Sequence, residues 1–147
     1  MKKLMRKADN IHRIGALLLL LLTGVWAAFA QGRLGWGDQG NGTYKNPVLN
    51  ADYSDPDVIR VGDKYYMVAS DFHYIGMQVL QSDDMVNWRL ASQVYARFDL
   101  SGWDANNHYA GGSWAPSIRW RDGRFYIYFC TPDEGLFMTT ADSAEGP

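Results

Sequence analysis

Two groups of short strand-like runs, about 60 residues apart, restrict the fold of this chain more than any other feature of its sequence. Each run is rich in β-branched and aromatic residues and is bounded by turn residues, a pattern typical of β-hairpins. The runs cover residues 57–61, 64–70, 77–82 and 88–92 in the first group, and 116–120, 124–130 and 135–143 in the second. The sequence therefore predicts an all-β chain of antiparallel hairpins.

The two groups also match each other as an internal repeat. Ile59 aligns with Ile118 at a spacing of 59 residues, and Tyr65 aligns with Phe125 at a spacing of 60. A repeat of this length that holds about four strands is typical of a β-propeller blade. A propeller needs roughly four to eight blades to close its ring. We therefore expect the first blade and most of the second to be present, and the chain to be an amino-terminal fragment.

The first 30 residues have the pattern of a secretory signal peptide. A basic segment precedes an apolar run, and the run ends in Ala28-Phe29-Ala30, a signal for cleavage after Ala30. A retained membrane anchor is the alternative, but the apolar run is shorter than the roughly 20 residues that a spanning helix needs. We expect a secreted or periplasmic protein with no membrane segment after cleavage. Residues 31–45 are glycine-rich and predict a linker, and the folded domain is expected over 46–147.

Charge and motif content exclude several classes of function. Removal of residues 1–30 takes away five of the 14 Lys and Arg and one of the 16 Asp and Glu, which leaves a net charge of −6. A nucleic-acid partner is therefore not expected, because phosphate binding needs a positive field. The lone Cys130 allows no internal disulfide, and its pattern is that of a buried apolar residue. The sequence contains no glycine-rich phosphate loop, no nucleophile elbow and no Cys/His metal cluster.

Two carboxylates flank a proline in the segment Ser54-Asp55-Pro56-Asp57. The proline favours an extended conformation at Asp55, so a strand is expected to begin beside it. The first strand of a propeller blade lines the central channel, and a carboxylate at its start would project toward the cavity of the fold. The alternative is that both aspartates only cap a turn, for which Asp-Pro is common chemistry.

Aromatic residues form a second set of candidates. Phe72 and His73 lie in a predicted loop between two strands, and aromatic faces in such loops are platforms for sugar rings. Alternatively, these aromatics only cover the edge of a blade. Trp114, in Gly111-Gly112-Ser113-Trp114, begins the second repeat and is either a channel-mouth residue or a core tryptophan. His73 has no partner at metal-ligand spacing, so no metal site is predicted.

Three segments carry a resemblance to a known family. The stretches NPVLNADYSDPDVIRVGDKYYMVAS, VLQSDDMVNWRL and GGSWAPSIRWRDGRFYIYF resemble, in order and spacing, the amino-terminal blades of glycoside hydrolase family 43. The resemblance runs from about Asn46 to Pro147. It implies a five-bladed β-propeller, of which this chain holds the first blade and most of the second.

The resemblance also implies roles for individual residues. Asp55 takes the place of the family's general base, Phe72 that of a substrate-contacting aromatic, and Trp114 that of the tryptophan flanking the sugar. The family's other two carboxylates, the general acid and an aspartate that tunes it, have no matching motif before Pro147. Asp133 is at best a residue at the edge of the site. The fragment by itself is therefore expected to be inactive.

The leading interpretation is a secreted inverting glycosidase that acts on xylan, arabinoxylan or arabinan and their oligosaccharides. The alternatives are a non-catalytic carbohydrate-binding propeller and a structural propeller used for protein contacts. No cofactor is expected to be required. Some relatives hold a calcium ion in the channel, but this sequence contains no recognisable ligand set for one.

Overall fold

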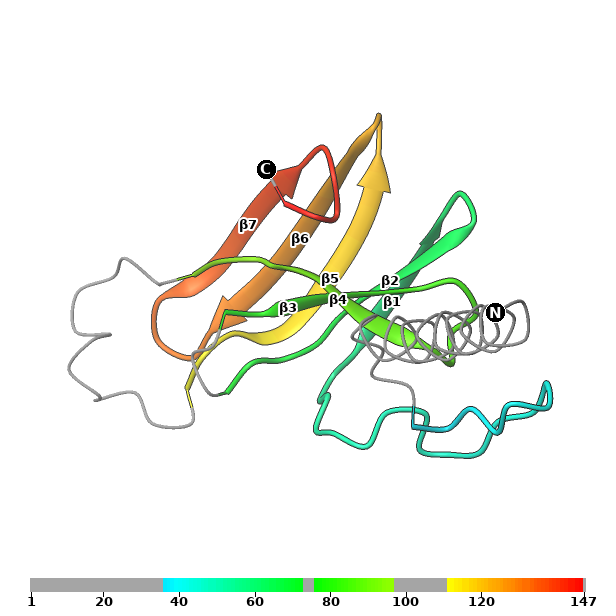
Figure 1. Cartoon of the computed structure of the whole chain (residues 1–147). Coiled ribbons are helices and arrows are strands. Elements are labelled where there is room, and N and C mark those ends of the chain that lie inside the picture. The colour runs from blue at the N-terminus through cyan, green and yellow to red at the C-terminus, as the bar shows by residue number, and fades with distance from the viewer. Residues whose placement is uncertain (1–35, 73–75, 97–110, 147) are drawn as a thin grey trace, which may run out of the picture. The chain divides into compact units, whose positions relative to one another are not determined.

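The computed structural model describes residues 36–72, 76–96 and 111–146, all within the unit Arg33–Pro147 (Figure 1). The predicted signal peptide (1–30) and His73 lie outside the described residues. In the described ranges no helix is long and apolar enough to cross a membrane.

Seven strands form two antiparallel sheets in the described part of the chain. A four-stranded sheet has the order β1-β2-β3-β4 and a three-stranded sheet the order β5-β6-β7, so each is a meander of sequential hairpins. The all-β prediction is confirmed, and every predicted run contains a strand. The strands are β1 (Asp57–Val61), β2 (Lys64–Val68), β3 (Gln78–Ser82), β4 (Trp88–Gln93), β5 (Trp114–Arg121), β6 (Arg124–Thr131) and β7 (Gly135–Ala141).

The hairpin registers correct one alignment made from the sequence. Val61 pairs with Lys64 across the first turn and Arg121 with Arg124 across the second, so equivalent positions are 60 residues apart. Ile118 is therefore equivalent to Val58, and the spacing of 59 that pairs it with Ile59 is wrong. This one-residue error in the alignment matters because a shift of one residue moves a side chain to the opposite face of a sheet.

Burial shows the consequence of this register. Ile59 packs from the first sheet into the core shared by the two sheets, and Ile118 enters the same core from the second sheet. Val58 packs into a second cluster, which involves Leu49. Equivalent strands thus present opposite faces to the shared core, as expected when similar sheets are stacked in series.

The shared core is apolar and contains large side chains from both sheets. Phe125, Ile127 and Phe129 of β6 are buried against Val68 and Val79 of the first sheet. Burial of each such side chain contributes roughly 1.5–3 kcal/mol to folding. This packing holds the two sheets together and so determines where their strand ends meet.

The second cluster lies against the segment that precedes β1. Trp88 is 2% exposed there, and its indole Nε1 donates to the carbonyl of Met85 at 3.0 Å. Trp120, in the second sheet, contacts Phe125 at a ring-centroid distance of 4.5 Å but remains 40% exposed. Trp88 is thus a core residue, whereas Trp120 is only partly covered.

Residues 36–45, the described part of the predicted linker, hydrogen-bond to the rest of the domain. The N–H of Trp36 donates to the carbonyl of Val48 at 3.1 Å, and Asn87 Nδ2 donates to Asp38 Oδ2 at 2.8 Å. Asp38 also forms a bridge with Tyr44. These contacts place the segment beside the turn between β3 and β4.

Candidate active site

Asp55 lies two residues before β1, and its side chain is exposed. Its carboxylate Oδ2 accepts a hydrogen bond from the hydroxyl of Ser70 at 2.8 Å. The backbone at Asp55 is left-handed, with φ of 49°, so the prediction that Pro56 keeps it extended is wrong. Aspartate tolerates this conformation better than most residues, and the prediction from the proline considered only local sterics.

Ala115 occupies the position equivalent to Asp55 in the second repeat and shares its backbone conformation. Its φ is 42°, and it too is followed by a proline, Pro116. The N–H of Ala115 donates to the hydroxyl of Ser70 at 2.8 Å. Ser70 therefore joins the two equivalent strand starts.

Asp57 has a different environment from Asp55. Its Oδ2 accepts a hydrogen bond from the N–H of Ile118 at 2.8 Å and pairs with Arg119 Nη1 at 2.5 Å. These contacts join β1 to β5. Of the two aspartates around Pro56, Asp57 is thus the one used in structure, and Asp55 is the one whose carboxylate is exposed.

Phe72 and Trp114 come together although they belong to different repeats. Their rings are in an edge-to-face arrangement with centroids 6.2 Å apart. Trp114 is 39% exposed, so it is not a core tryptophan. Its indole Nε1 donates to the carbonyl of Gly111 at 2.6 Å, which orients the ring. Trp114 therefore offers an exposed aromatic face beside the strand that follows Asp55, and the half-buried ring of Phe72 packs against it.

A backbone bridge holds these two aromatics in place. Asp71 and Ser113 exchange two hydrogen bonds, Asp71 N–H to Ser113 O at 2.9 Å and Ser113 N–H to Asp71 O at 3.0 Å. Gly112 makes this approach possible, because a Cβ there would lie 1.9 Å from the Asp71 carbonyl oxygen, and its φ is 77°. A glycine at position 112 thus allows the two backbone segments to approach closely.

Beside Ser70 the surface is hollowed to a volume of about 200 Å³. Tyr53 OH lies 3.3 Å from Gln78 Oε1 in its wall, and burial raises the pKa of Tyr53. Asp52 and Asp71 also line the hollow, which is therefore rich in groups that bind hydroxyls. Sequence inspection alone missed Tyr53, Gln78 and Ser70, because none belongs to a catalytic pattern.

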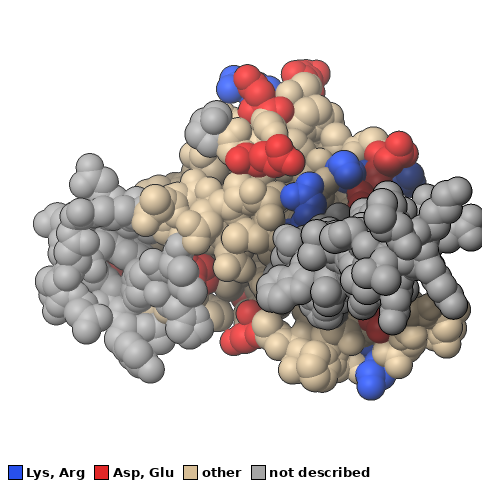
Figure 2. All heavy atoms as spheres, in the orientation of Figure 1, with Lys and Arg blue, Asp and Glu red and all other residues tan. Residues whose placement is uncertain are grey.

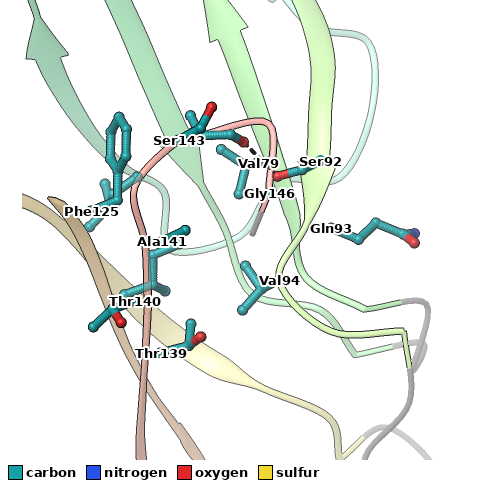
Figure 3. Close-up of a pocket in the computed structure, with 13 residues that line it drawn as sticks. Val79, Ser92, Gln93, Val94, Phe125, Thr139, Thr140, Ala141, Ser143 and Gly146 are labelled. Carbon is teal, nitrogen blue, oxygen red and sulfur yellow. Dashed lines mark hydrogen bonds between the residues drawn. The ribbon is translucent and has the colours of Figure 1, made fainter.

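A second cavity, of about 100 Å³, lies between the two sheets (Figure 3). Val79, Val94, Ile118 and Phe125 are among its lining residues, and none of the residues that line it is a carboxylate. Ser92 Oγ donates to the carbonyl of Ala144 at 2.6 Å across it. It is a packing gap in the shared core and has no groups for acid–base chemistry.

Charged side chains of the described residues do not form a continuous basic patch on the face of the molecule that Figure 2 shows. Acidic and basic side chains lie interspersed in Figure 2. Arg124 pairs with Asp142 at 2.7 Å, and Lys64 pairs with Asp83 at 2.8 Å. Among the residues that the structure describes, no group of three or more His, Cys, Asp or Glu could hold a metal ion.

Asp133 lies in the turn between β6 and β7, at the same end of the second sheet as Trp114.

Comparisons with known proteins agree with this arrangement. The model of the family described as glycosyl hydrolases family 43 matches residues 44–147. A Xylanibacter ruminicola protein named "Putative beta-xylosidase" is 71% identical over 113 residues, covering 77% of this chain and 21% of the relative. A Bacteroides ovatus protein named "Non-reducing end alpha-L-arabinofuranosidase BoGH43B" is 34% identical over 135 residues, covering 88% of this chain and 24% of the relative.

A solved structure supports the same assignment at the level of the fold. The bifunctional GH43-CE protein of Bacteroides eggerthii superposes with a TM-score of 0.64 at 33% identity, covering 69% of this chain and 14% of that one. The chain spans 21% and 24% of the length of the two curated relatives. The family model covers most of the chain, and it includes both strand starts of the site. The chain belongs to glycosyl hydrolases family 43.

Proposed function

We propose that the protein containing these residues hydrolyses O-glycosidic bonds in xylose- or arabinose-containing plant polysaccharides or their oligosaccharides. The observation that carries the proposal is the position of the exposed Asp55 carboxylate, linked through Ser70 to the strand that begins with Trp114. A carboxylate and exposed aromatic faces are the groups that glycoside hydrolysis uses to move a proton and to hold a sugar ring. The printed names of the relatives, a xylosidase and an arabinofuranosidase, support the choice of sugars.

In the proposed mechanism Asp55 is the general base of an inverting reaction. Its ionised carboxylate takes a proton from water while the water oxygen bonds to the anomeric carbon. The bond from that carbon to the leaving oxygen breaks at the same time, and a carboxylic acid protonates that oxygen. Inverting enzymes place the two carboxyl groups roughly 6.5–9.5 Å apart to admit the water. The proposal assigns the acid, and the aspartate that tunes it, to a part of the protein outside these 147 residues.

The same proposal gives Phe72, Trp114 and His73 the role of binding the sugar. Trp114 offers an exposed face at one rim of the site with the half-buried Phe72 beside it, whereas His73 lies outside the described residues. The domain is proposed to be a five-bladed propeller in which β1–β4 form the first blade and β5–β7 most of the second. A cleaved signal peptide and export from the cytoplasm belong to the proposal as well.

The proposal is tested with the protein expressed from its complete reading frame. Aryl β-xylosides, aryl α-L-arabinofuranosides, xylan and arabinan are the substrates, and Asp55→Asn is the variant. We expect release of xylose or arabinose with inverted anomeric configuration, and a loss of at least ~10²-fold in kcat for Asp55→Asn, the lower end of general-base contributions. Activity retained in the variant removes Asp55 from the base role. Xylan binding without release of reducing ends supports a carbohydrate-binding propeller instead.

A further inference from the structure

Ser70 is the one described residue whose side chain touches both the Asp55 carboxylate and the second repeat. It follows β2, its Oγ lies 2.8 Å from Asp55 Oδ2, and the same Oγ lies 2.8 Å from the nitrogen of Ala115. The start of the first repeat and the start of the second thus meet at one hydroxyl.

The chemistry of the three groups determines the direction of both hydrogen bonds. A backbone N–H only donates, so the Ser70 hydroxyl accepts from Ala115. A hydroxyl has a single proton, and an ionised carboxylate only accepts. The proton of Ser70 is therefore directed to Asp55 Oδ2. The arrangement suits the ionised state that a general base requires.

Ser70 is itself held from both sides. Its N–H donates to the carbonyl of Ser54 at 2.9 Å, next to Asp55 in the chain. The following residue, Asp71, is bridged to Ser113 of the second repeat. The hydroxyl therefore has little freedom to move away from Asp55. Asp55 Oδ1, in contrast, has no hydrogen-bond partner among the described residues.

The backbone of Ala115 supports a specific role for this contact. Alanine has no side-chain group that favours the left-handed region, yet its φ is 42° and a proline follows it. Strained residues persist where the surrounding structure requires them, and they cluster at functional sites. Here the conformation directs the N–H of Ala115 to Ser70.

We propose that Ser70 is a positioning residue for the general base. It holds Asp55 Oδ2 through a hydroxyl anchored on the Ala115 N–H, so that Oδ1 is the oxygen that takes the proton from water. The inference rests on the proposed function and goes beyond it, because it makes the geometry of the base depend on the second repeat. Without the hydroxyl, the carboxylate rotates away from its productive orientation.

The test uses Ser70→Ala, Ser70→Thr and Asp55→Asn in the protein from the complete reading frame. Misplacement of a reacting group by about 1 Å costs up to ~10²-fold, so Ser70→Ala is expected to lower kcat about 10- to 100-fold. KM should stay within about twofold, because the serine holds the base and not the sugar. Ser70→Thr keeps the hydroxyl and should restore most of the lost kcat.

Two further measurements separate positioning from a general loss of structure. Azide attacks the anomeric carbon without giving up a proton, so it should raise the turnover of an activated aryl glycoside by Asp55→Asn and by Ser70→Ala. Ser92→Ala is the matched control, because it removes a serine hydroxyl that hydrogen-bonds to the Ala144 carbonyl in the shared core. Its azide response should equal that of the unsubstituted protein.

The outcomes distinguish the positioning role from the proposed function. A kcat within twofold of the unsubstituted protein in Ser70→Ala, together with an inactive Asp55→Asn, overturns the positioning role and leaves the function standing. Full activity in Asp55→Asn overturns both. If Ser70→Ala does not fold, Ser70→Cys fills the same space with a weaker donor and should show the same kcat loss and azide response. A Cys variant with unchanged kcat overturns the inference.

Discussion

The carboxylate of Asp57 accepts a hydrogen bond from the backbone N–H of Ile118 at 2.8 Å, although 61 residues separate them in the chain. Ile118 is fully buried in the shared core, and this partly buried contact joins β1 to β5. Two residues before Asp57, Asp55 is linked to the same strand through Ser70. Asp57 thus contacts the second repeat directly, whereas Asp55 is linked to it only through Ser70 and keeps an exposed carboxylate.

Replacement of Asp57 by alanine should destabilise the protein more than loss of its ion-pair partner. Asp57→Ala leaves the Ile118 N–H without its acceptor, which costs about 1–3 kcal/mol in the free energy of unfolding. Arg119→Ala should cost less than about 1 kcal/mol, because the side chain of Arg119 is 59% exposed and exposed ion pairs contribute little. Urea unfolding of both variants checks this. Equal losses would mean that the ion pair, and not the hydrogen bond from the Ile118 N–H, determines the effect.

Gly112→Ala should be strongly destabilising, and a matched glycine shows why. At Gly112 a new Cβ meets the Asp71 carbonyl oxygen at 1.9 Å in a backbone with φ of 77°. Overpacking and the left-handed conformation together should lower the free energy of unfolding by about 2–5 kcal/mol. Gly123 has φ of 80° with nothing within 4 Å of its Cβ position, so Gly123→Ala should cost only about 1–2 kcal/mol. The difference in unfolding free energy between the two variants measures the close approach, and a difference near zero contradicts it.

The turn after β3 should contribute to stability in a pH-dependent way. Burial by itself raises the pKa of Asp84, but hydrogen bonds from Asn87, Val86 and Ser82 outweigh it and lower the pKa from 3.8 to about 2. A folded-state pKa below the unfolded value stabilises the protein above about pH 4, and this stability is lost as the pH falls through about 2. A carbon-13 NMR titration should place the Asp84 midpoint near pH 2.

Two variants test the cause of that shift. Asp84→Asn should weaken the dependence of the unfolding free energy on pH between about pH 4 and 2, because the titrating group is gone. Ser82→Ala removes one hydroxyl donor, at 3.0 Å from Asp84 Oδ1, and should raise the Asp84 midpoint toward its ordinary value. An unchanged pH dependence in Asp84→Asn would show that other carboxylates account for the acid sensitivity.

Trp114→Ala should weaken sugar binding in the protein from the complete reading frame. Loss of an exposed aromatic face at the rim of the site is expected to raise KM for the glycoside about 10-fold, with a smaller effect on kcat. Trp120→Ala is the matched control, because Trp120 is similarly exposed, at 40% against 39%, but lies near the other end of β5. It should lower the melting temperature and leave KM unchanged. Equal KM values for the two variants would remove Trp114 from the sugar site.

Local chemistry made much of the fold predictable. Alternating apolar residues and turn residues such as Gly62-Asp63 act over a few positions, and the strands they predicted are present. The motifs around Asp55 and Trp114 also indicated the family. One local rule failed at Asp55, where a proline predicted extended backbone and the residue is left-handed. The backbone there is determined by contacts across the site and not by the neighbouring residue alone.

The sequence by itself determined the strands, the hairpin turns and the candidate residues, because these depend on neighbours a few positions apart. Only the tertiary structure decided that Ile59 and Ile118 enter one core from opposite sheets, and that Ser70 joins Asp55 to Ala115. These relationships depend on how two sheets stack, and stacking is set by the summed packing of many side chains. Ser70, which belongs to no catalytic pattern in the sequence, thus becomes one of the contacts between the two repeats at the proposed site.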